Sequence, residues 1–236
     1  TTCGIYALTA GYGTVVGNDF IVGCGSDCNF GIYADEVAGF CLEDNTFSPK
    51  VTNMGKPFGI AVVNSHGAND VYNNDFQDLR CGNVAVGSNT GVSSGQIGPV
   101  SGLTYSCNTN SGSRVDFCVL KDGNAGGIAS QQGSTSLPAG NTFGGSHYHF
   151  YNDGDQQITY YYDNHDPSQI PATSLLYRVN PYSLKTSNEC LSHYGNNTPI
   201  SKSASEKAAL ASEYFSACST YNSLRQLYES RIDGGS

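Results

Sequence analysis

The sequence is poor in basic side chains and in charge generally. Its 236 residues include 11 Lys and Arg against 20 Asp and Glu, which gives a formal net charge of −9. Charged residues make up 13% of the chain, about half the usual share. Nucleic acids and anionic membranes are bound through Lys and Arg, so we expect neither as a partner. Asn, Ser, Thr and Gly supply the polarity instead, which suits an extracellular β-protein better than a cytosolic enzyme.

The sequence also lacks long apolar runs. None approaches the roughly 18 residues of a membrane-spanning helix, and no signal peptide precedes the first repeat. We therefore expect no membrane span. Because the chain opens in mid-repeat at Thr1, we expect a processed product or a piece of a longer protein.

Cysteine is abundant, with nine residues, yet no C-x-x-C pair or Cys/His cluster has the spacing of a zinc site. Disulfides are therefore favoured over metal, and an oxidising compartment outside the cell is expected. We predict no metal site and no cofactor. Cys24 and Cys28 are close enough in sequence to pair, as are Cys107 and Cys118, although sequence leaves the connectivity open. The odd number leaves at least one thiol unpaired or bonded outside this chain.

Two short phrases recur at one period. Gly4-Ile5-Tyr6-Ala7 returns 27 residues later as Gly31-Ile32-Tyr33-Ala34, and Asn18-Asp19-Phe20 returns 27 residues later as Asn45-Thr46-Phe47. A third copy, with Gly59-Ile60-Ala61 and Asn74-Asp75-Phe76, follows at offsets of 28 and 29. A period in the twenties without intervening helical segments indicates an all-β solenoid, a parallel β-helix. The alternative, an antiparallel sandwich, does not predict phrases that recur in register.

Equivalent residues of successive coils of a β-helix stack about 4.8 Å apart. We therefore predict an inward amide column in which each Asn bonds the next, and an inward aromatic column beside it. Ile5, Ile32 and Ile60 would form a third column, with Gly as the corner residue. The alternative is that Asn-x-Phe is only a turn followed by a core aromatic. The two predicted ladders consist of Asn18, Asn45, Asn74 and Asn108, and of Phe20, Phe47 and Phe76.

The repeat becomes irregular in its fourth coil. Cys107-Asn108-Thr109-Asn110 keeps the Asn and loses the Phe, and the Gly/Ser-rich stretch from Gly87 to Gly102 is predicted to bulge as a loop. The fifth coil returns with Gly140-Asn141-Thr142-Phe143. We therefore assign about five coils to residues 1–145.

Residues 146–198 are predicted to form terminal strands and an irregular cap. The turn signal at Asn152-Asp153-Gly154-Asp155 makes the strands on either side a hairpin or the last edge strands. Residues 199–236 are predicted to form an amphipathic α-helix that caps the coil or binds a partner. Its evidence is the capping box Ser203-x-x-Glu206 and an apolar stripe at helical spacing.

No convergent set of catalytic residues is found. The Asn-Thr-Asp, Asp-Asp and Gly-His-Gly phrases of pectin-hydrolysing β-helices are absent, so we predict no catalytic residue. Asp35-Glu36 and Glu43-Asp44 are interpreted as solvated loop charges. A glycan-binding groove is the alternative, and its candidate residues are Asp35, Glu36, His66, Tyr160 and Tyr162.

The second half of the chain resembles large secreted and cell-surface proteins of Bacteroidetes that carry right-handed β-helix repeats and are exported by type IX secretion. The resemblance covers roughly residues 100 to 236. It rests on the phrases Gly102-Leu-Thr-Tyr-Ser-Cys-Asn-Thr109, Gly127-Ile-Ala-Ser-Gln-Gln-Gly133, Leu137-Pro-Ala-Gly-Asn-Thr-Phe143, Ile158-Thr-Tyr-Tyr-Tyr-Asp163 and Ile232-Asp-Gly-Gly235. It implies a right-handed coil, this export route and an adhesive or surface-layer role, and it brings no catalytic residues.

We therefore expect a non-enzymatic extracellular structural or adhesive module, a segment or subunit of a surface filament. Its partners would be neighbouring copies or upstream coils of the same protein, joined end to end. The alternative is a carbohydrate-binding or polysaccharide-degrading β-helix.

Overall fold

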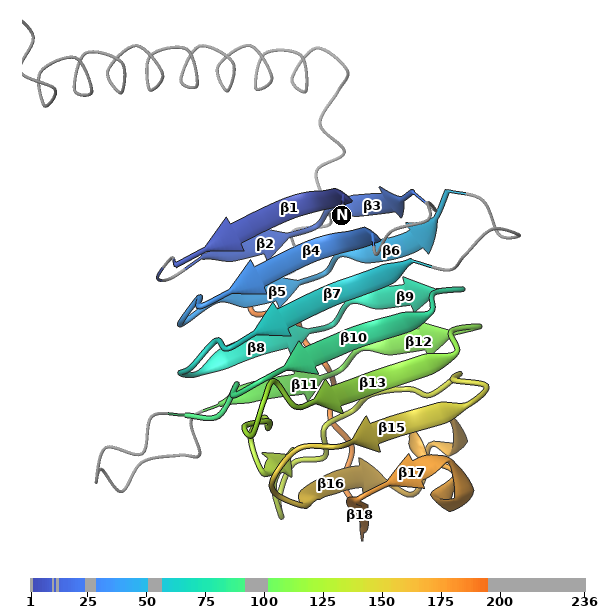
Figure 1. The fold of residues 1–236 in the computed structure, drawn as a ribbon. Helices are drawn as coiled ribbons and strands as arrows, with labels where there is room; N and C mark the ends of the chain where they lie inside the picture. The colour runs from blue at the N-terminus through green and yellow to red at the C-terminus, as the bar shows by residue number, and fades with distance from the viewer. Residues whose placement is uncertain are drawn as a thin grey trace, which may run out of the picture. The chain divides into compact units, whose positions relative to one another are not determined.

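The repeated phrases lie in parallel strands, each paired with the equivalent strand of the next coil (Figure 1). The computed structural model describes residues 2–9, 11, 13–23, 29–50, 57–91 and 102–194. The predicted helix at 199–236, Cys24, Cys28 and most of the Gly87–Gly102 loop lie outside these residues. Residues up to His193 belong to one compact unit.

The largest sheet takes one strand from each successive coil. It consists of β1 (Thr2–Leu8), β4 (Asn29–Asp35), β7 (Phe58–Val63), β10 (Cys81–Val86), β13 (Val115–Leu120), β15 (Tyr148–Asn152) and β17 (Leu176–Tyr177). A second sheet consists of β2 (Thr14–Val16), β5 (Cys41–Glu43), β8 (Asn69–Tyr72) and β11 (Leu103–Ser106). A third consists of β3 (Asp19–Val22), β6 (Thr46–Pro49), β9 (Asp75–Gln77) and β12 (Thr109–Ser111).

A short sheet follows the later coils. It consists of β14 (Gln131–Gln132), β16 (Ile158–Asp163) and β18 (Val179–Leu184), and two 3₁₀ helices, η1 (Pro167–Gln169) and η2 (Thr173–Leu175), lie between its last strands. Within the described residues, no helix is long and apolar enough to cross a membrane.

The prediction of a parallel β-solenoid is confirmed, and the antiparallel sandwich is wrong. All pairings between the named strands are parallel: Ile32 lies opposite Ile5 and Ile60, and Phe47 lies opposite Phe20 and Phe76. The period of the sequence repeat therefore equals the length of one coil of the solenoid.

The aromatic column consists of stacked rings. Phe47 lies between Phe20 and Phe76 with ring centroids 4.8 and 5.0 Å apart and planes within 8° of parallel. The rings lie over the glycines of the first phrase, where a Cβ at Gly31 would come within 2.5 Å of the Phe47 ring. The expectation that this glycine forms the corner is wrong, because it lies within a strand beneath the ring.

The corner before each amide of the Asn column has a left-handed backbone. Gly17, Asp44, Asn73, Cys107 and Gly140 have φ of 67°, 55°, 53°, 60° and 74°. Gly, Asn and Asp adopt this conformation more readily than other residues, so four of the five positions suit their residue type. The corner therefore recurs as a fourth stacked position.

The asparagines of the repeat form one hydrogen-bonded column. Asn45 Oδ1 accepts from the backbone N–H and the amide of Asn18, at 3.0 and 3.1 Å. The same pair of bonds recurs from Asn45 to Asn74, from Asn74 to Asn108 and from Asn108 to Asn141, at 2.8–3.1 Å. Each interior amide thus receives two bonds from the coil before it and donates to the coil after it.

The fourth and fifth coils each replace one member of these columns. Asn110 lies opposite Phe76, where the earlier coils carry Phe. Asp116 lies between residues paired with Cys81 and Asn83, so it occupies the position that Gly82 holds in the preceding coil. In the fourth coil the Asn110 side chain takes the place of the ring above Gly82, where a Cβ would come within 2.9 Å of Asn110 Oδ1.

Stacking continues beyond residue 145. β15 pairs with β13 and β17, and β16 pairs with β14 and β18, all in parallel. A hairpin between β15 and β16 was one of two predictions for this stretch, and it is wrong. Asp153 and Gly154 instead form a corner between two sheets, because β15 and β16 belong to different sheets.

The disulfide joins Cys107 to Cys190, 83 residues apart. The candidate pairing of Cys107 with Cys118 is therefore wrong. Cys118 lies on β13 and retains its thiol. The bond instead ties the segment that follows β18 back to the corner of the fourth coil.

Candidate functional site

A polar array covers the outer face of the second sheet. On β5 and β8, Leu42 and Val71 point into the core, so their neighbours point outward. The strand register places Cys41 beside Asp70 and Glu43 beside Tyr72. Four outward side chains from two coils therefore form a two-by-two array.

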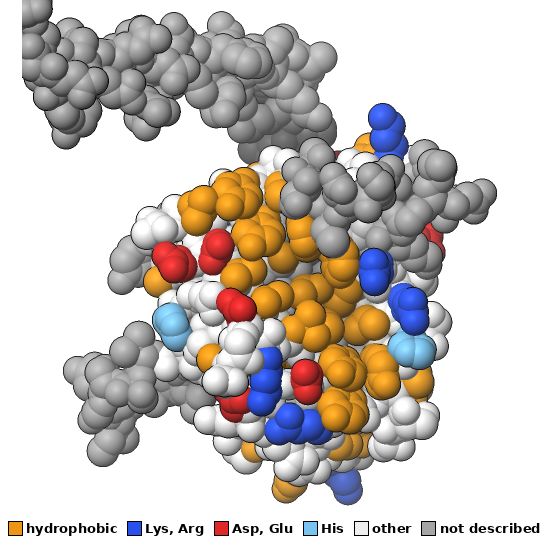
Figure 2. Space-filling model, in the orientation of Figure 1, with side chains coloured by type: hydrophobic (Ala, Val, Ile, Leu, Met, Phe, Trp, Pro, Cys, Tyr) orange, Lys and Arg blue, Asp and Glu red, His pale blue; other side chains and the backbone are white. Residues whose placement is uncertain are grey.

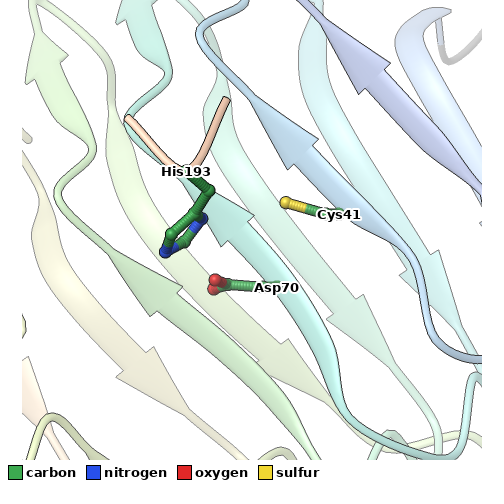
Figure 3. Close-up of side chains that lie close together, drawn as sticks. All are labelled: Cys41, Asp70 and His193. Atoms are coloured by element: carbon green, nitrogen blue, oxygen red, sulfur yellow. The ribbon is translucent and has the colours of Figure 1, made fainter. Parts of the chain in front are cut away.

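Residues 188–193, here called the arm, cross this array in the direction opposite to the order of the coils. The arm is held by the Cys107–Cys190 disulfide, by the Asn188 amide, which donates to Pro138 O at 3.0 Å, and by the Tyr72 hydroxyl, which donates to Leu191 O at 2.8 Å. These three attachments place Ser192 and His193 over β5 and β8, as the His193 side chain in Figure 3 illustrates.

The centre of the contact is the Glu43 carboxylate, which has no exposed surface. Glu43 Oε1 accepts from the Ser192 hydroxyl at 2.7 Å and from the His193 backbone N–H at 2.6 Å. Glu43 Oε2 lies 2.9 Å from His193 Nδ1 and accepts from the Cys41 thiol at 3.7 Å. A buried carboxylate is costly unless its oxygens are bonded, so the arm is needed to complete this site.

Asp44 adds a second carboxylate to the arm contact. Its Oδ2 lies 2.9 Å from the Ser192 hydroxyl, and its Oδ1 accepts from the Asn73 amide at 2.6 Å. Ser192 therefore lies between two acidic side chains. The interpretation of Glu43-Asp44 as solvated loop charges is wrong for Glu43 and incomplete for Asp44, which is half-buried.

The electrostatics of the array are set by burial and by its carboxylates. Burial raises the pKa of Asp70, and Glu43 raises it further, whereas the Thr104 hydroxyl bond and His193 lower it. Burial, followed by Glu43, Asp70 and Asp44, raises the pKa of Tyr72 to about 12. In both groups burial is the largest cause of the raised pKa, and the neighbouring carboxylates add to it.

A nitrogen, a sulfur and an oxygen meet at this surface. Cys41, Asp70 and His193 each offer one ligand atom, and these three atoms lie within 4.8 Å of one another (Figure 3). The His193 ring packs on the Tyr72 ring, with centroids 4.1 Å apart. The donors belong to β5, β8 and the arm, so their convergence is a property of the folded chain.

The residues predicted for glycan binding do not meet at one place. Asp35 and Glu36 lie at a corner, where Glu36 accepts from the Thr9 hydroxyl at 3.3 Å and the charges of Glu36 and Asp122 add to burial in raising the pKa of Asp35. His66 is exposed in the next coil, with Nδ1 3.2 Å from Thr90 O.

The two tyrosines of that prediction serve the core. Tyr160 is only 1% exposed, and its hydroxyl accepts from the Asn141 amide at 3.2 Å, so it ends the Asn column. Tyr162 packs against the core and is half-buried. The proposed use of Tyr160 for sugar stacking is wrong, because its ring is enclosed by protein.

Sequence reasoning missed the array and the arm. The available signal was the pair Cys41-x-Glu43 and Asp70-x-Tyr72, polar or aromatic residues at outward positions of strands whose central residue is apolar. Ser192 and His193 gave no signal, because nothing local shows that they return to β5.

Comparisons with protein-family models, with curated proteins and with solved structures find no match to this chain.

Proposed function

We propose that this chain is a non-enzymatic structural or adhesive module of the extracellular space or cell surface, a segment or subunit of a surface filament. The observation that carries the proposal is the first coil, whose columns are built to continue into another coil. The interior supports it, because the Asn, Phe and Ile columns consist of residues that bond or stack from coil to coil.

Among the described residues, the columns of the first coil have a neighbouring coil on one side. Every later Asn of the column accepts at Oδ1 from the preceding coil, and Asn18 Oδ1 occupies that position at the start of the described stack. Tyr6, Leu8 and Ile21 of this coil are 57%, 51% and 71% exposed. A coil with the same phrase would complete the amide column and cover these side chains.

The two ends of the stack differ in how they treat their edge strands. β1 has seven residues without proline, and among the described strands it pairs only with β4. β18 contains Pro181, which has no N–H to donate and is typical of edges protected from further pairing. We therefore assign association to the β1 end, with a coil of a neighbouring copy or an upstream coil of the same protein as the partner.

The disulfide supports the proposed location, since such bonds persist in oxidising compartments. The right-handed sense of the coil, a C-terminal helical cap, the Bacteroidetes source and the type IX export route belong to the same proposal. They rest on the resemblance stated above.

Electron microscopy of the full chain tests this function. Fibres or paired particles are the expected result, and single particles at every concentration would contradict association. Incubation with polysaccharides, followed by reducing-sugar and unsaturated-product assays, tests the non-enzymatic part. Turnover of any polysaccharide would overturn it.

Carbohydrate binding is a second candidate, favoured by one observation. Hydrophobic side chains gather on the outer face of the seven-stranded sheet (Figure 2). They include two stacked pairs of tyrosine rings. The ring centroids of Tyr6 and Tyr33 lie 5.2 Å apart, and those of Tyr151 and Tyr177 lie 4.9 Å apart. Aromatic rings at such a face suit the apolar faces of sugars.

A glycan array tests this second candidate. Tyr6→Ala combined with Tyr33→Ala is expected to abolish binding, whereas Tyr182→Ala is the matched control, since Tyr182 is 52% exposed on β18 in another sheet. Silence of the unmodified chain on the array would contradict carbohydrate binding.

A further inference from the structure

We propose that Cys41, Asp70 and His193 bind a divalent transition-metal ion of the zinc class, with Glu43 as the hydrogen-bonding partner of the histidine ligand. The site is additional to the structural role proposed above and does not depend on it. It would join the arm to the second and third coils.

The donor set points to this class of ion. Thiolate, imidazole and carboxylate are the three ligand types of protein zinc sites, whereas calcium and magnesium select oxygen alone. Three protein ligands are characteristic of zinc sites that keep a position for water or a small ligand. The His193 side chain is 51% exposed, so solvent reaches the site.

Glu43 prepares His193 as a ligand. A carboxylate at Nδ1 accepts the proton of that nitrogen and leaves the Nε2 lone pair for a metal. The Nδ1–Oε2 distance of 2.9 Å and the full burial of Glu43 meet this requirement. The Tyr72 ring, with its centroid 4.1 Å from that of the imidazole, restricts the ring further.

Asp70 is supported in the same way. The Thr104 hydroxyl, on the next strand of the sheet, donates to Asp70 Oδ1 at 2.9 Å and leaves Oδ2 for a ligand bond. Ligand residues held by such neighbours are oriented before the ion arrives.

The charge of the surroundings favours a cation. Glu43, Asp44 and Asp70 lie together, and the ion pairs found among the described residues give Glu43 only His193 as a basic partner. A divalent ion would supply positive charge where three carboxylates meet.

The geometry requires a small closure. Donor atoms in a tetrahedral zinc site lie about 3.5 Å apart, whereas the three here lie within 4.8 Å. The strand register fixes Cys41 beside Asp70. Rotation of the Cys41 and Asp70 side chains, with the bond from His193 to Glu43 kept, supplies the movement.

Isothermal titration of the full chain, with its disulfide intact, tests the site with Zn²⁺ as the probe. Cys41→Ser, Asp70→Asn and His193→Gln are each expected to weaken binding more than tenfold, and Glu43→Gln by roughly 10–100-fold. His66→Gln, which changes an exposed histidine of another surface, and Cys118→Ser, which removes another half-buried thiol, are expected to leave affinity unchanged. Equal affinity of His193→Gln and the unmodified chain would overturn the proposal.

A second measurement uses the unmodified chain and so does not depend on the folding of a variant. Alkylation by iodoacetamide, mapped to individual cysteines by mass spectrometry, is followed with and without Zn²⁺. We expect zinc to slow modification of Cys41 at least tenfold and to leave Cys118 unaffected. An unchanged rate at Cys41 under saturating zinc would overturn the site.

Discussion

The first coil, β1 to β3, and the third coil, β7 to β9, carry the same phrases but bury them differently. In the third coil, Ile60 and Phe76 have no exposed surface and Asn74 is 1% exposed. Their equivalents in the first coil are half-buried or, in the case of Asn18, exposed. The residue types are the same, so the difference arises from the neighbours: the third coil has a coil on both sides.

This comparison shows that a column residue contributes fully only when coils flank it. Apolar burial and hydrogen-bond satisfaction both depend on the adjacent coil, as expected for a solenoid whose repeats contact only their neighbours. The first coil is therefore the weak member of the stack and also the member that another coil would stabilise most.

The largest expected difference between the two coils is in the aromatic column. Phe76→Ala removes a fully buried ring that stacks on Phe47, and it should lower the free energy of unfolding by about 3–5 kcal/mol. Phe20→Ala, its matched control, removes a half-buried ring and should cost less than half as much. Urea unfolding of both variants measures this, and equal losses would contradict the comparison.

The fifth coil extends the comparison through Asp116, whose carboxylate is buried in the place of a glycine. Burial raises the pKa of Asp116 to about 7, although bonds from the backbone N–H groups of Gly145 and Gly144 lower it. The folded pKa exceeds the unfolded one, so stability from the protonated form is complete below about pH 4 and is lost as the pH rises towards 7.

Asp116→Asn should therefore stabilise the protein at pH 8 by up to about 4 kcal/mol relative to the parent chain. At pH 4 the difference should nearly vanish. Urea unfolding at the two pH values measures it, and a difference that does not change with pH would show that the carboxylate is not the source.

The amide column gives the next largest effect. Asn74→Leu leaves the donors of Asn45 and the carbonyls of Leu42 and Tyr72 without their partner, and we expect a loss of about 3 kcal/mol. Asn18→Leu changes the exposed end of the same column and should cost less than about 1 kcal/mol. Thermal unfolding compares the two variants, and an unchanged melting temperature for Asn74→Leu would exclude a stabilising column.

The fold was predictable where the stabilising interactions join equivalent residues of adjacent coils. Stacked Asn and Phe residues need an equivalent residue one coil away, and that requirement is visible as a recurring phrase. The hairpin alternative for 148–162 failed, since Asn152-Asp153-Gly154 supplies a tight turn for a solenoid corner as readily as for a hairpin. Which of the two forms depends on strand partners elsewhere in the chain.

The candidate site was not predictable, because its parts are separated by long stretches of sequence. Glu43 and His193 are 150 residues apart, and Cys107 and Cys190 are 83 apart. Glu43 has the sequence surroundings of a solvated corner charge, and only the return of the arm buries it. Side chains that point outward from the strands also differ from coil to coil. The repeated phrases therefore give no sign of which outward residues form a site.

Sedimentation velocity of the full chain over a range of concentrations tests most directly whether the chain associates through its first coil. The unmodified chain and Tyr182→Lys, changed on β18, should associate equally. Tyr6→Lys combined with Ile21→Lys places charges on the exposed first coil, as natural edge strands do to prevent pairing, and should weaken association at least tenfold. A chain that stays monomeric throughout, or one whose association is lost in Tyr182→Lys and kept in the first-coil variant, would contradict the account.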